Sequence, residues 1–143
     1  MDLRQITPEF AVAPQITPEE VAQAAALGYR TLINNRPDTE VEEQIDSAAM
    51  AAAAAAAGMA YHHLPYFPGA LTPDLVADFE AVMADVATPV LAYCRSGTRS
   101  SHLWAMWQAR EGTPVGTIVA AAERAGYDHS GLAPLLRQHA EGH

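Results

Sequence analysis

The chain has 143 residues, half of them hydrophobic, and a formal net charge of −9 at pH 7. This length and composition favour a single folded domain over residues 1–143 and exclude a disordered chain. All eight basic residues are arginines, and the acidic balance argues against a nucleic-acid partner. Outside the alanine-rich segment no apolar stretch could span a membrane, and residues 1–5 do not resemble a signal peptide, so we expect a cytoplasmic protein without a membrane partner.

Apolar spacing, helix-start residues and turn residues predict strands alternating with helices along the chain. Strands are predicted at residues 6–12, 31–33, 59–64 and 89–93. Helices are predicted at residues 17–27, 40–57, 72–83, 101–110, 114–125 and 132–139. This alternation indicates an α/β domain with a mostly parallel central sheet flanked by helices.

Three loops follow predicted strands, at residues 34–38, 65–71 and 94–100. Active sites of parallel sheets lie at the carboxyl ends of the strands. We therefore expect the three loops to meet at one edge of the sheet.

The third loop contains the only cysteine, in the heptapeptide Cys94-Arg95-Ser96-Gly97-Thr98-Arg99-Ser100. A single cysteine excludes an internal disulfide, and most single cysteines are small buried hydrophobic residues. Here the thiol lies between a strand and a helix, where unpaired N–H groups and the helix dipole stabilise a thiolate. Gly97 permits a tight loop, and the two arginines bracket it.

These features predict a nucleophilic thiolate in a cradle for a small oxyanion. Cys94 is the predicted nucleophile, and Arg99 is predicted to offer its guanidinium to the oxygens of the anion. Ser100 is expected to hydrogen-bond the thiolate, and Arg95 is expected to point outward and attract anions. The anion-binding set is predicted to comprise Arg95, Ser96, Gly97, Thr98 and Ser100.

Residues 33–40 and 93–100 resemble the bacterial beta-lactamase hydrolase-like, phosphatase-like family, and this resemblance covers nearly the whole chain. It implies the fold of the dual-specificity phosphatases. The family also occurs fused to persulfide dioxygenase-like or sulfide-oxidising domains, which implies such a protein as a partner. The loop itself is similar to a rhodanese loop, which commonly reads Cys-Arg-Ser-Gly-x-Arg.

Two activities fit this resemblance. Cysteine phosphatases place five residues between cysteine and arginine, whereas four separate Cys94 from Arg99, as in rhodanese loops. Phosphoester cleavage also uses a proton donor, and no acid directly follows Pro68 in the neighbouring loop. Asp74 is present, but aspartate is common at helix starts for dipole reasons alone.

The spacing therefore favours a sulfurtransferase that moves sulfur from thiosulfate or glutathione persulfide through a Cys94 persulfide to a thiol or cyanide. A cysteine-dependent phosphatase acting through a phosphocysteine is the alternative. A non-catalytic module that binds an anion or persulfide is the third interpretation. None of these schemes calls for a cofactor.

Arg36, Asp38, Phe67 and Asp74 are candidates for the rim of the pocket. For Arg36 and Asp38 the competing interpretation is a salt-bridged turn that carries the following helix. No metal site is predicted, because neighbouring residues such as His62 and His63 point to opposite faces of a strand.

Three further features have structural interpretations. Trp104 and Trp107 are expected in the core or an interface. Asp128 and His129 suggest a catalytic dyad, but a loop with a helix cap is the commoner arrangement. His139 and His143 are expected in a frayed tail.

Overall fold

The computed structural model describes residues 1–142. Five strands form one sheet in the order β1-β2-β5-β3-β4. The strands are β1 (Arg4–Thr7), β2 (Phe10–Ala13), β3 (Thr31–Asn34), β4 (Ala60–His63) and β5 (Val90–Tyr93). Only β1 runs antiparallel, against β2, and the other neighbours are parallel. The predicted α/β fold with a mostly parallel sheet is confirmed.

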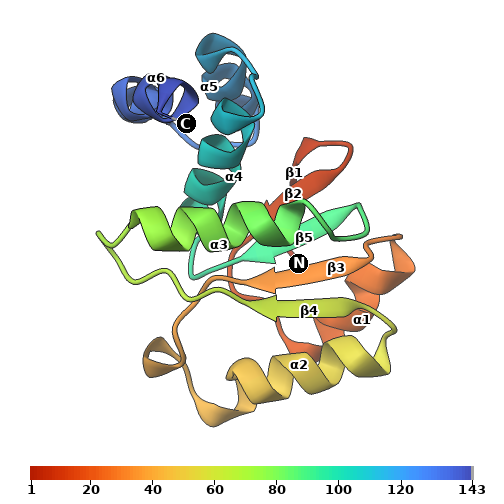
Figure 1. Ribbon diagram of the computed structural model, residues 1–143. Coiled ribbons are helices and arrows are strands. Elements are labelled where there is room, and N and C mark those ends of the chain that lie inside the picture. The colour runs from red at the N-terminus through yellow and green to blue at the C-terminus, as the bar shows by residue number, and fades with distance from the viewer. Residues whose placement is uncertain (143) are drawn as a thin grey trace.

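Helices cover both faces of this sheet (Figure 1). They are α1 (Pro18–Ala26), α2 (Ser47–Ala56), α3 (Pro73–Met83), α4 (Thr98–Arg110), α5 (Val115–Arg124) and α6 (Ala133–Glu141). The first two pack on one face, where a core of small and aliphatic side chains forms. The other four lie on the opposite side, with α5 and α6 beyond α4.

The prediction of a single strand at residues 6–12 was wrong. Residues 6–12 do not form one segment, because the chain turns at Pro8 and Glu9 and returns as β2. The Glu9 N–H donates to Thr7 Oγ1 at 3.2 Å and stabilises this turn. The hairpin places β2 beside β5, the strand that leads to Cys94.

The helix starts at Thr17 and Thr72 are confirmed. Thr17 and Glu20 form a reciprocal capping box, and Thr72 Oγ1 accepts the Leu75 N–H at 3.2 Å. Each threonine is followed by proline at the first helical position, where no N–H is needed.

The helix predicted at residues 40–57 begins later than expected. Two 3₁₀ turns, Asp38–Glu40 and Glu43–Ile45, precede α2. Asp46 is the N-cap, and its Oδ1 accepts the Ala49 N–H at 2.9 Å. A capping aspartate stabilises the helix start at that position over an earlier one, so Glu40 stays outside α2.

Helix α4 begins earlier than expected, at Thr98 rather than Ser101. Gly97 is its N-cap and has φ = 89°, a left-handed conformation that glycine adopts without steric cost. Thr98, Arg99 and Ser100 therefore form the first turn of α4, and the loop proper contains only residues 94–97.

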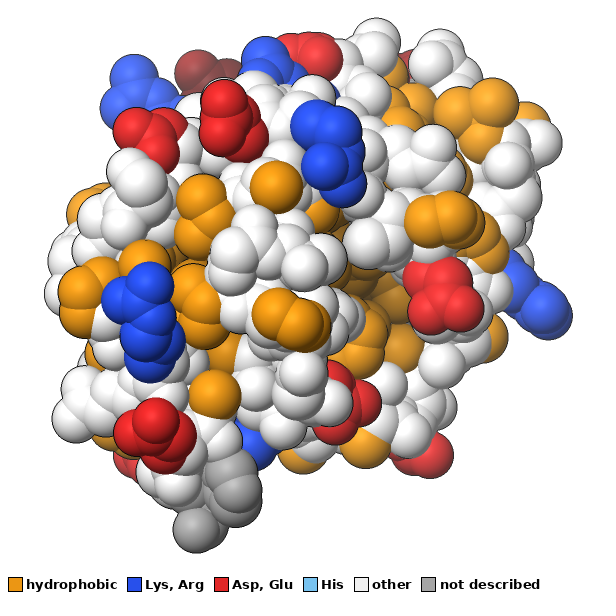
Figure 2. Space-filling model, turned by 90° about the horizontal axis from the view of Figure 1, so that it is seen from above, with side chains coloured by type: hydrophobic (Ala, Val, Ile, Leu, Met, Phe, Trp, Pro, Cys, Tyr) orange, Lys and Arg blue, Asp and Glu red, His pale blue; other side chains and the backbone are white. Residues whose placement is uncertain are grey.

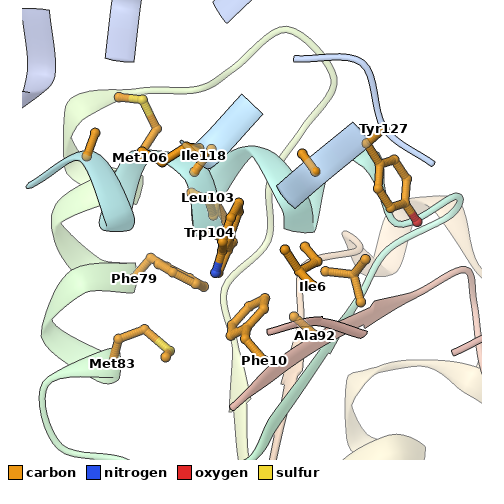
Figure 3. Packing of buried hydrophobic residues seen from close by; sticks show 14 of the residues in the cluster. Ile6, Phe10, Phe79, Met83, Ala92, Leu103, Trp104, Met106, Ile118 and Tyr127 are labelled. Carbon is orange, nitrogen blue, oxygen red and sulfur yellow. The ribbon is translucent and has the colours of Figure 1, made fainter. Parts of the chain in front are cut away.

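Aromatic side chains fill the core between the sheet and α3, α4 and α5 (Figure 3). Phe10 meets Phe79 edge-on, with ring centroids 6.1 Å apart. Trp104 is buried in the same cluster, and Trp107 packs against Phe10. This packing fixes α4 on the sheet, and α4 carries Arg99.

No helix within residues 1–142 is long and apolar enough to cross a membrane. On the face seen in Figure 2, arginine side chains lie singly among acidic and uncharged ones. The expected frayed tail was wrong for His139, which lies in α6 with Nε2 3.0 Å from Glu80 Oε2. His143 lies outside the described residues.

Candidate active site

Cys94 directly follows β5, and its side chain is fully buried. The Gly97 N–H donates to Cys94 Sγ at 3.1 Å. A backbone N–H directed at the sulfur is a donor for the negative charge of an attacking sulfur. The sulfur therefore already has one of the donors predicted from the sequence.

The outer side of the loop is open to solvent. Arg95 and Ser96 are exposed. Ser96 Oγ donates to Thr98 Oγ1 at 3.0 Å and accepts the Thr98 N–H at 3.4 Å. The hydroxyls of Ser96 and Thr98 are thus hydrogen-bonded to each other.

Ser100 does not contact the thiol as expected. Its buried hydroxyl donates to Asn35 Oδ1 at 2.8 Å. Asn35 in turn donates from Nδ2 to the Leu64 carbonyl, and its own N–H donates to the Tyr93 carbonyl. Ser100 thus ties α4 to the chain that follows β3.

Arg99 connects the three loops at the carboxyl ends of the strands. Nη1 and Nη2 bind the two carboxylate oxygens of Glu40 at 2.9 and 2.7 Å. Nη1 also donates to the Tyr66 carbonyl at 2.6 Å. The residues before α2, those after β4 and those after β5 therefore meet at one guanidinium.

These contacts use only part of the guanidinium, which has five N–H groups in a fixed plane. Glu40 occupies the end formed by Nη1 and Nη2, and Tyr66 occupies the other Nη1–H. The Nε–H and the second Nη2–H lie side by side on the edge that neither Glu40 nor Tyr66 occupies. The pKa of Arg99 is raised, chiefly by its hydrogen bonds to Glu40 and further by the nearby Cys94 sulfur.

Glu40 is held by a second arginine. Arg36 Nε donates to Glu40 Oε1 at 3.2 Å, and Arg36 Nη2 donates to the Glu40 carbonyl at 3.2 Å. Arg36 Nη1 donates to Gln15 Oε1. The pKa of Glu40 is lowered, first by the hydrogen bond from Arg99 and also by that from Arg36, so Glu40 is an anion at neutral pH.

The remaining rim candidates are more peripheral. Asp38 Oδ1 accepts the Ser47 N–H at 2.8 Å, at the start of the helix that follows, while the salt bridge of this turn joins Arg36 to Glu40. Asp74 is exposed in the first turn of α3, and Phe67 is half exposed on the loop after β4. Within residues 1–142, Glu40 is the acidic residue hydrogen-bonded to Arg99, and no hydrogen bond joins Asp74 to the Cys94 loop.

Glu40, Tyr66 and Asn35 are site residues that sequence reasoning did not single out. A signal existed for Asn35 and Glu40, because both lie in residues 33–40, which carry the family resemblance. Tyr66 contributes through its backbone carbonyl, and no side-chain pattern marks such a contact.

Two hydrogen-bonded histidines lie close together, His102 in α4 and His129 in the segment after α5. His102 Nδ1 is 3.0 Å from Tyr66 OH, and His129 Nε2 is 2.8 Å from Ser101 Oγ. The two imidazole rings are 5.0 Å apart. His129 thus pairs with Ser101, while Asp128 accepts from the Ser130 N–H, so the two do not form a dyad.

Burial keeps these two histidines neutral. The pKa of His102 is lowered to about 4, first by burial and then by His129. The pKa of His129 is also lowered by burial. Both rings therefore act as neutral hydrogen-bonding groups at neutral pH.

The lowered pKa of His102 predicts acid sensitivity. Below the ordinary histidine pKa of about 6.5 the unfolded chain binds a proton that the folded protein rejects. Stability is therefore greatest above that pH and falls as the pH drops toward 4. Because the ring is partly open to water, we expect a loss of about 1 kcal/mol between pH 7 and pH 5.

Urea unfolding at these two pH values measures this loss. His102→Gln keeps a hydrogen-bonding side chain and should reduce the pH dependence, while His62→Gln on β4 should leave it unchanged. An equal loss in wild type and His102→Gln would contradict the assignment. Glu40 does not interfere, because its stabilisation is complete above its ordinary pKa and is lost only as the pH falls through its lowered folded value.

A hollow of about 460 Å³ opens between α3, α4 and α6, away from this site. Leu71, Val76, Met106 and Leu135 are among the residues that line it, and neither Cys94 nor Arg99 does. The candidate site is therefore identified by the reactive side chains Cys94 and Arg99 and not by the volume of a hollow.

Known proteins resemble the chain at the level of sequence and fold. Residues 2–111 match the family described as beta-lactamase hydrolase-like protein, phosphatase-like domain. A beta-lactamase hydrolase-like protein of Xylella fastidiosa is 33% identical over 112 residues, which are 78% of this chain and 26% of that protein. One from Agrobacterium fabrum is 32% identical over 108 residues, 76% of this chain and 25% of that protein. The chain thus spans about a quarter of these relatives.

Among solved structures, a candidate phosphatase from Neisseria meningitidis is 35% identical, with a TM-score of 0.83 over 97% of this chain and 99% of that one. The core catalytic domain of the PP-IP phosphatase SIW14 from S. cerevisiae is 12% identical, with a TM-score of 0.70 over 99% and 85%. The latter shows a shared fold only.

These similarities agree with the resemblance inferred from residues 33–40 and 93–100, and the neighbours have the cysteine-phosphatase fold. They favour the phosphatase alternative over the sulfurtransferase that the loop spacing favoured. The chain belongs to the beta-lactamase hydrolase-like, phosphatase-like domain family.

Proposed function

We propose that the protein is a cysteine-dependent phosphatase with Cys94 as nucleophile. The observation that carries this proposal is the buried Cys94 sulfur, held by the Gly97 N–H beside the Arg99 guanidinium. Two parallel N–H groups on one edge of a guanidinium match two oxygens of a phosphoryl group. The phosphatase fold of the structural neighbours supports this choice of anion.

The reaction has two steps. The Cys94 thiolate attacks phosphorus, the bond from phosphorus to the leaving oxygen breaks, and a phosphocysteine forms. Water then attacks phosphorus, the P–S bond breaks with its electron pair returning to sulfur as the thiolate, and inorganic phosphate leaves while the proton lost by the water passes to solvent. Arg99 and the loop N–H groups stabilise the negative charge on the phosphoryl oxygens in both steps.

The surroundings of Cys94 predict the class of phosphate compound. Glu40 is held as an anion by two arginines, and Asp74 is exposed without a bond to the loop. Neither side chain is placed to protonate a departing alkoxide. We therefore propose substrates whose leaving groups depart as stable anions, such as aryl phosphates or phosphoanhydrides.

A leaving-group series tests this preference. General acid catalysis contributes about 10²- to 10⁴-fold, so without it kcat/KM should fall at least about 10²-fold from p-nitrophenyl phosphate to a simple alkyl phosphate. Asp74→Asn should leave the dependence unchanged, as should Asp78→Asn one turn further along α3. A flat dependence would contradict the proposed substrate class, and a steep dependence that appears only in Asp74→Asn would identify Asp74 as the proton donor.

A sulfurtransferase is the second candidate, favoured by the four residues between Cys94 and Arg99. In this scheme the thiolate attacks the outer sulfur of thiosulfate, the S–S bond breaks, and sulfite leaves with the electron pair. Cyanide or a thiol then takes the sulfur from the Cys94 persulfide. This route also needs no proton donor for its leaving group.

Parallel assays distinguish the two candidates. Phosphate release from p-nitrophenyl phosphate without thiocyanate from thiosulfate and cyanide is the result we expect. Thiocyanate formation without phosphate release, together with one added sulfur on Cys94 by mass spectrometry, would replace the phosphatase proposal with the sulfurtransferase. Failure of both reactions, with tight anion binding, would leave a binding module.

A further inference from the structure

We infer that Tyr127 is a positioning residue, whose hydroxyl orients the peptide that holds the Cys94 sulfur. Tyr127 OH donates to the Ser96 carbonyl at 3.1 Å. The N–H of the same peptide group, that of Gly97, donates to Cys94 Sγ at 3.1 Å. One peptide thus connects the tyrosine to the thiol.

The geometry of a peptide makes this connection effective. The peptide between Ser96 and Gly97 is trans, so its C=O and N–H point in opposite directions in one plane. A hydrogen bond that holds the carbonyl on the outside therefore directs the N–H inward, at the sulfur. Donation to the carbonyl also polarises the peptide and strengthens its N–H as a donor.

Tyr127 is itself held in place by two neighbours, Arg4 and His129. Arg4 lies over its ring, 5.3 Å from the centroid, and Arg4 Nη1 donates to the Ala125 carbonyl at 3.3 Å. The ring stacks against His129, whose Nε2 is bonded to Ser101 Oγ in α4. Figure 3 shows the Tyr127 hydroxyl pointing away from the core side chains.

Gly97 completes the contact. A Cβ built at this position would collide with the Tyr127 hydroxyl, so the tyrosine packs directly on the loop backbone. The pKa of Tyr127 is raised by burial and further by Cys94, which keeps the phenol protonated and able to donate. Tyr127 lies beyond residues 2–111, so the range that matches the family does not include this contact.

The inference rests on the proposed role of Cys94 as a nucleophile, but not on which group it attacks. Alkylation by iodoacetamide therefore tests it without a substrate, and Cys94 is the only cysteine that can react. In Tyr127→Phe we expect the pH midpoint of alkylation to move upward by about 0.5–1 pH unit, with a threefold to about tenfold lower rate at pH 7, because one modest hydrogen bond is lost.

Tyr29→Phe is the matched control. Tyr29 is half buried and precedes β3, at the opposite end of the parallel strands, so its midpoint should equal that of wild type. Thermal unfolding of both variants checks that the fold is retained. We expect it to be retained because phenylalanine keeps the aromatic ring. If Tyr127→Phe unfolds, Tyr127→His replaces it in the test. Histidine is a shorter hydrogen-bond donor, so its pH midpoint of alkylation should lie above that of wild type.

The outcomes distinguish the role of Cys94 as nucleophile from the role of Tyr127 as positioning residue. A wild-type midpoint no lower than that of a free thiol would contradict the nucleophile, and with it the proposed function. A low midpoint that is the same in wild type and Tyr127→Phe would overturn the role of Tyr127 and leave the proposed function standing.

Discussion

Cys94→Ser is expected to abolish turnover, with a loss of at least about 10³-fold for phosphate release or for sulfur transfer. A serine hydroxyl is a weak nucleophile unless a base removes its proton. Within residues 1–142 the groups hydrogen-bonded to the Cys94 sulfur are the Gly97 N–H and the Arg99 guanidinium, which are donors and cannot act as a base. Steady-state rates with p-nitrophenyl phosphate, and with thiosulfate and cyanide, measure the loss.

This variant should keep its fold and its affinity for anions, because serine is nearly isosteric with cysteine and Arg99 is unchanged. Inorganic phosphate should therefore protect wild type and Cys94→Ser equally against thermal unfolding. Ser130→Ala, an exposed serine beyond α5, is the control and should retain full activity. Residual turnover above about a tenth of wild type would mean that the chemistry does not pass through Cys94.

The sheet and the position of the thiol could be predicted from the sequence because they depend on local patterns. The apolar run before Cys94 and the caps at Thr17 and Thr72 act over a few residues, and local chain geometry decides them. The same reasoning placed the loops after β3, β4 and β5 at one edge of the sheet. Arg99 confirms that convergence by contacting the residues that follow two of these strands.

Element boundaries near the site were less predictable because side chains decided them. Asp46 rather than Thr39 or Glu40 caps α2, and nothing in the alanine-rich pattern separates those positions. This boundary determines the chemistry of the site. In the structure Glu40 ends the first 3₁₀ turn, outside α2, and its carboxylate binds Arg99.

Contacts between distant residues could not be predicted from one sequence. Ser100 was expected at the thiol, but Asn35, 65 positions earlier, accepts its hydrogen bond. Tyr127 stabilises the loop from 31 positions away. Each of these contacts depends on how α4 and the segment after α5 pack on the sheet, which residue patterns do not encode.

The contacts of Glu40 with Arg99 explain why the site needs an arginine rather than another cationic side chain such as lysine. Glu40 and Tyr66 use three N–H groups of Arg99, and the two on the remaining edge take no part in these contacts. A lysine ammonium has three N–H groups in all. Glu40 and the Tyr66 carbonyl would compete for all of them, so little would remain for a substrate.

Arg99→Lys should therefore lower kcat/KM by about 10²- to 10³-fold, the range for losing a preorganised donor at a reacting oxyanion. Glu40→Gln should cost less, about tenfold, because Arg99 keeps both substrate-facing N–H groups but loses the charged partner that fixes its orientation. Glu43→Gln, in the exposed 3₁₀ turn before α2, is the matched control. Steady-state kinetics of the three variants, with thermal unfolding as a check of folding, give the comparison. An Arg99→Lys variant within threefold of wild type would show that a single positive charge suffices, and that the planar edge of Arg99 does not recognise the anion.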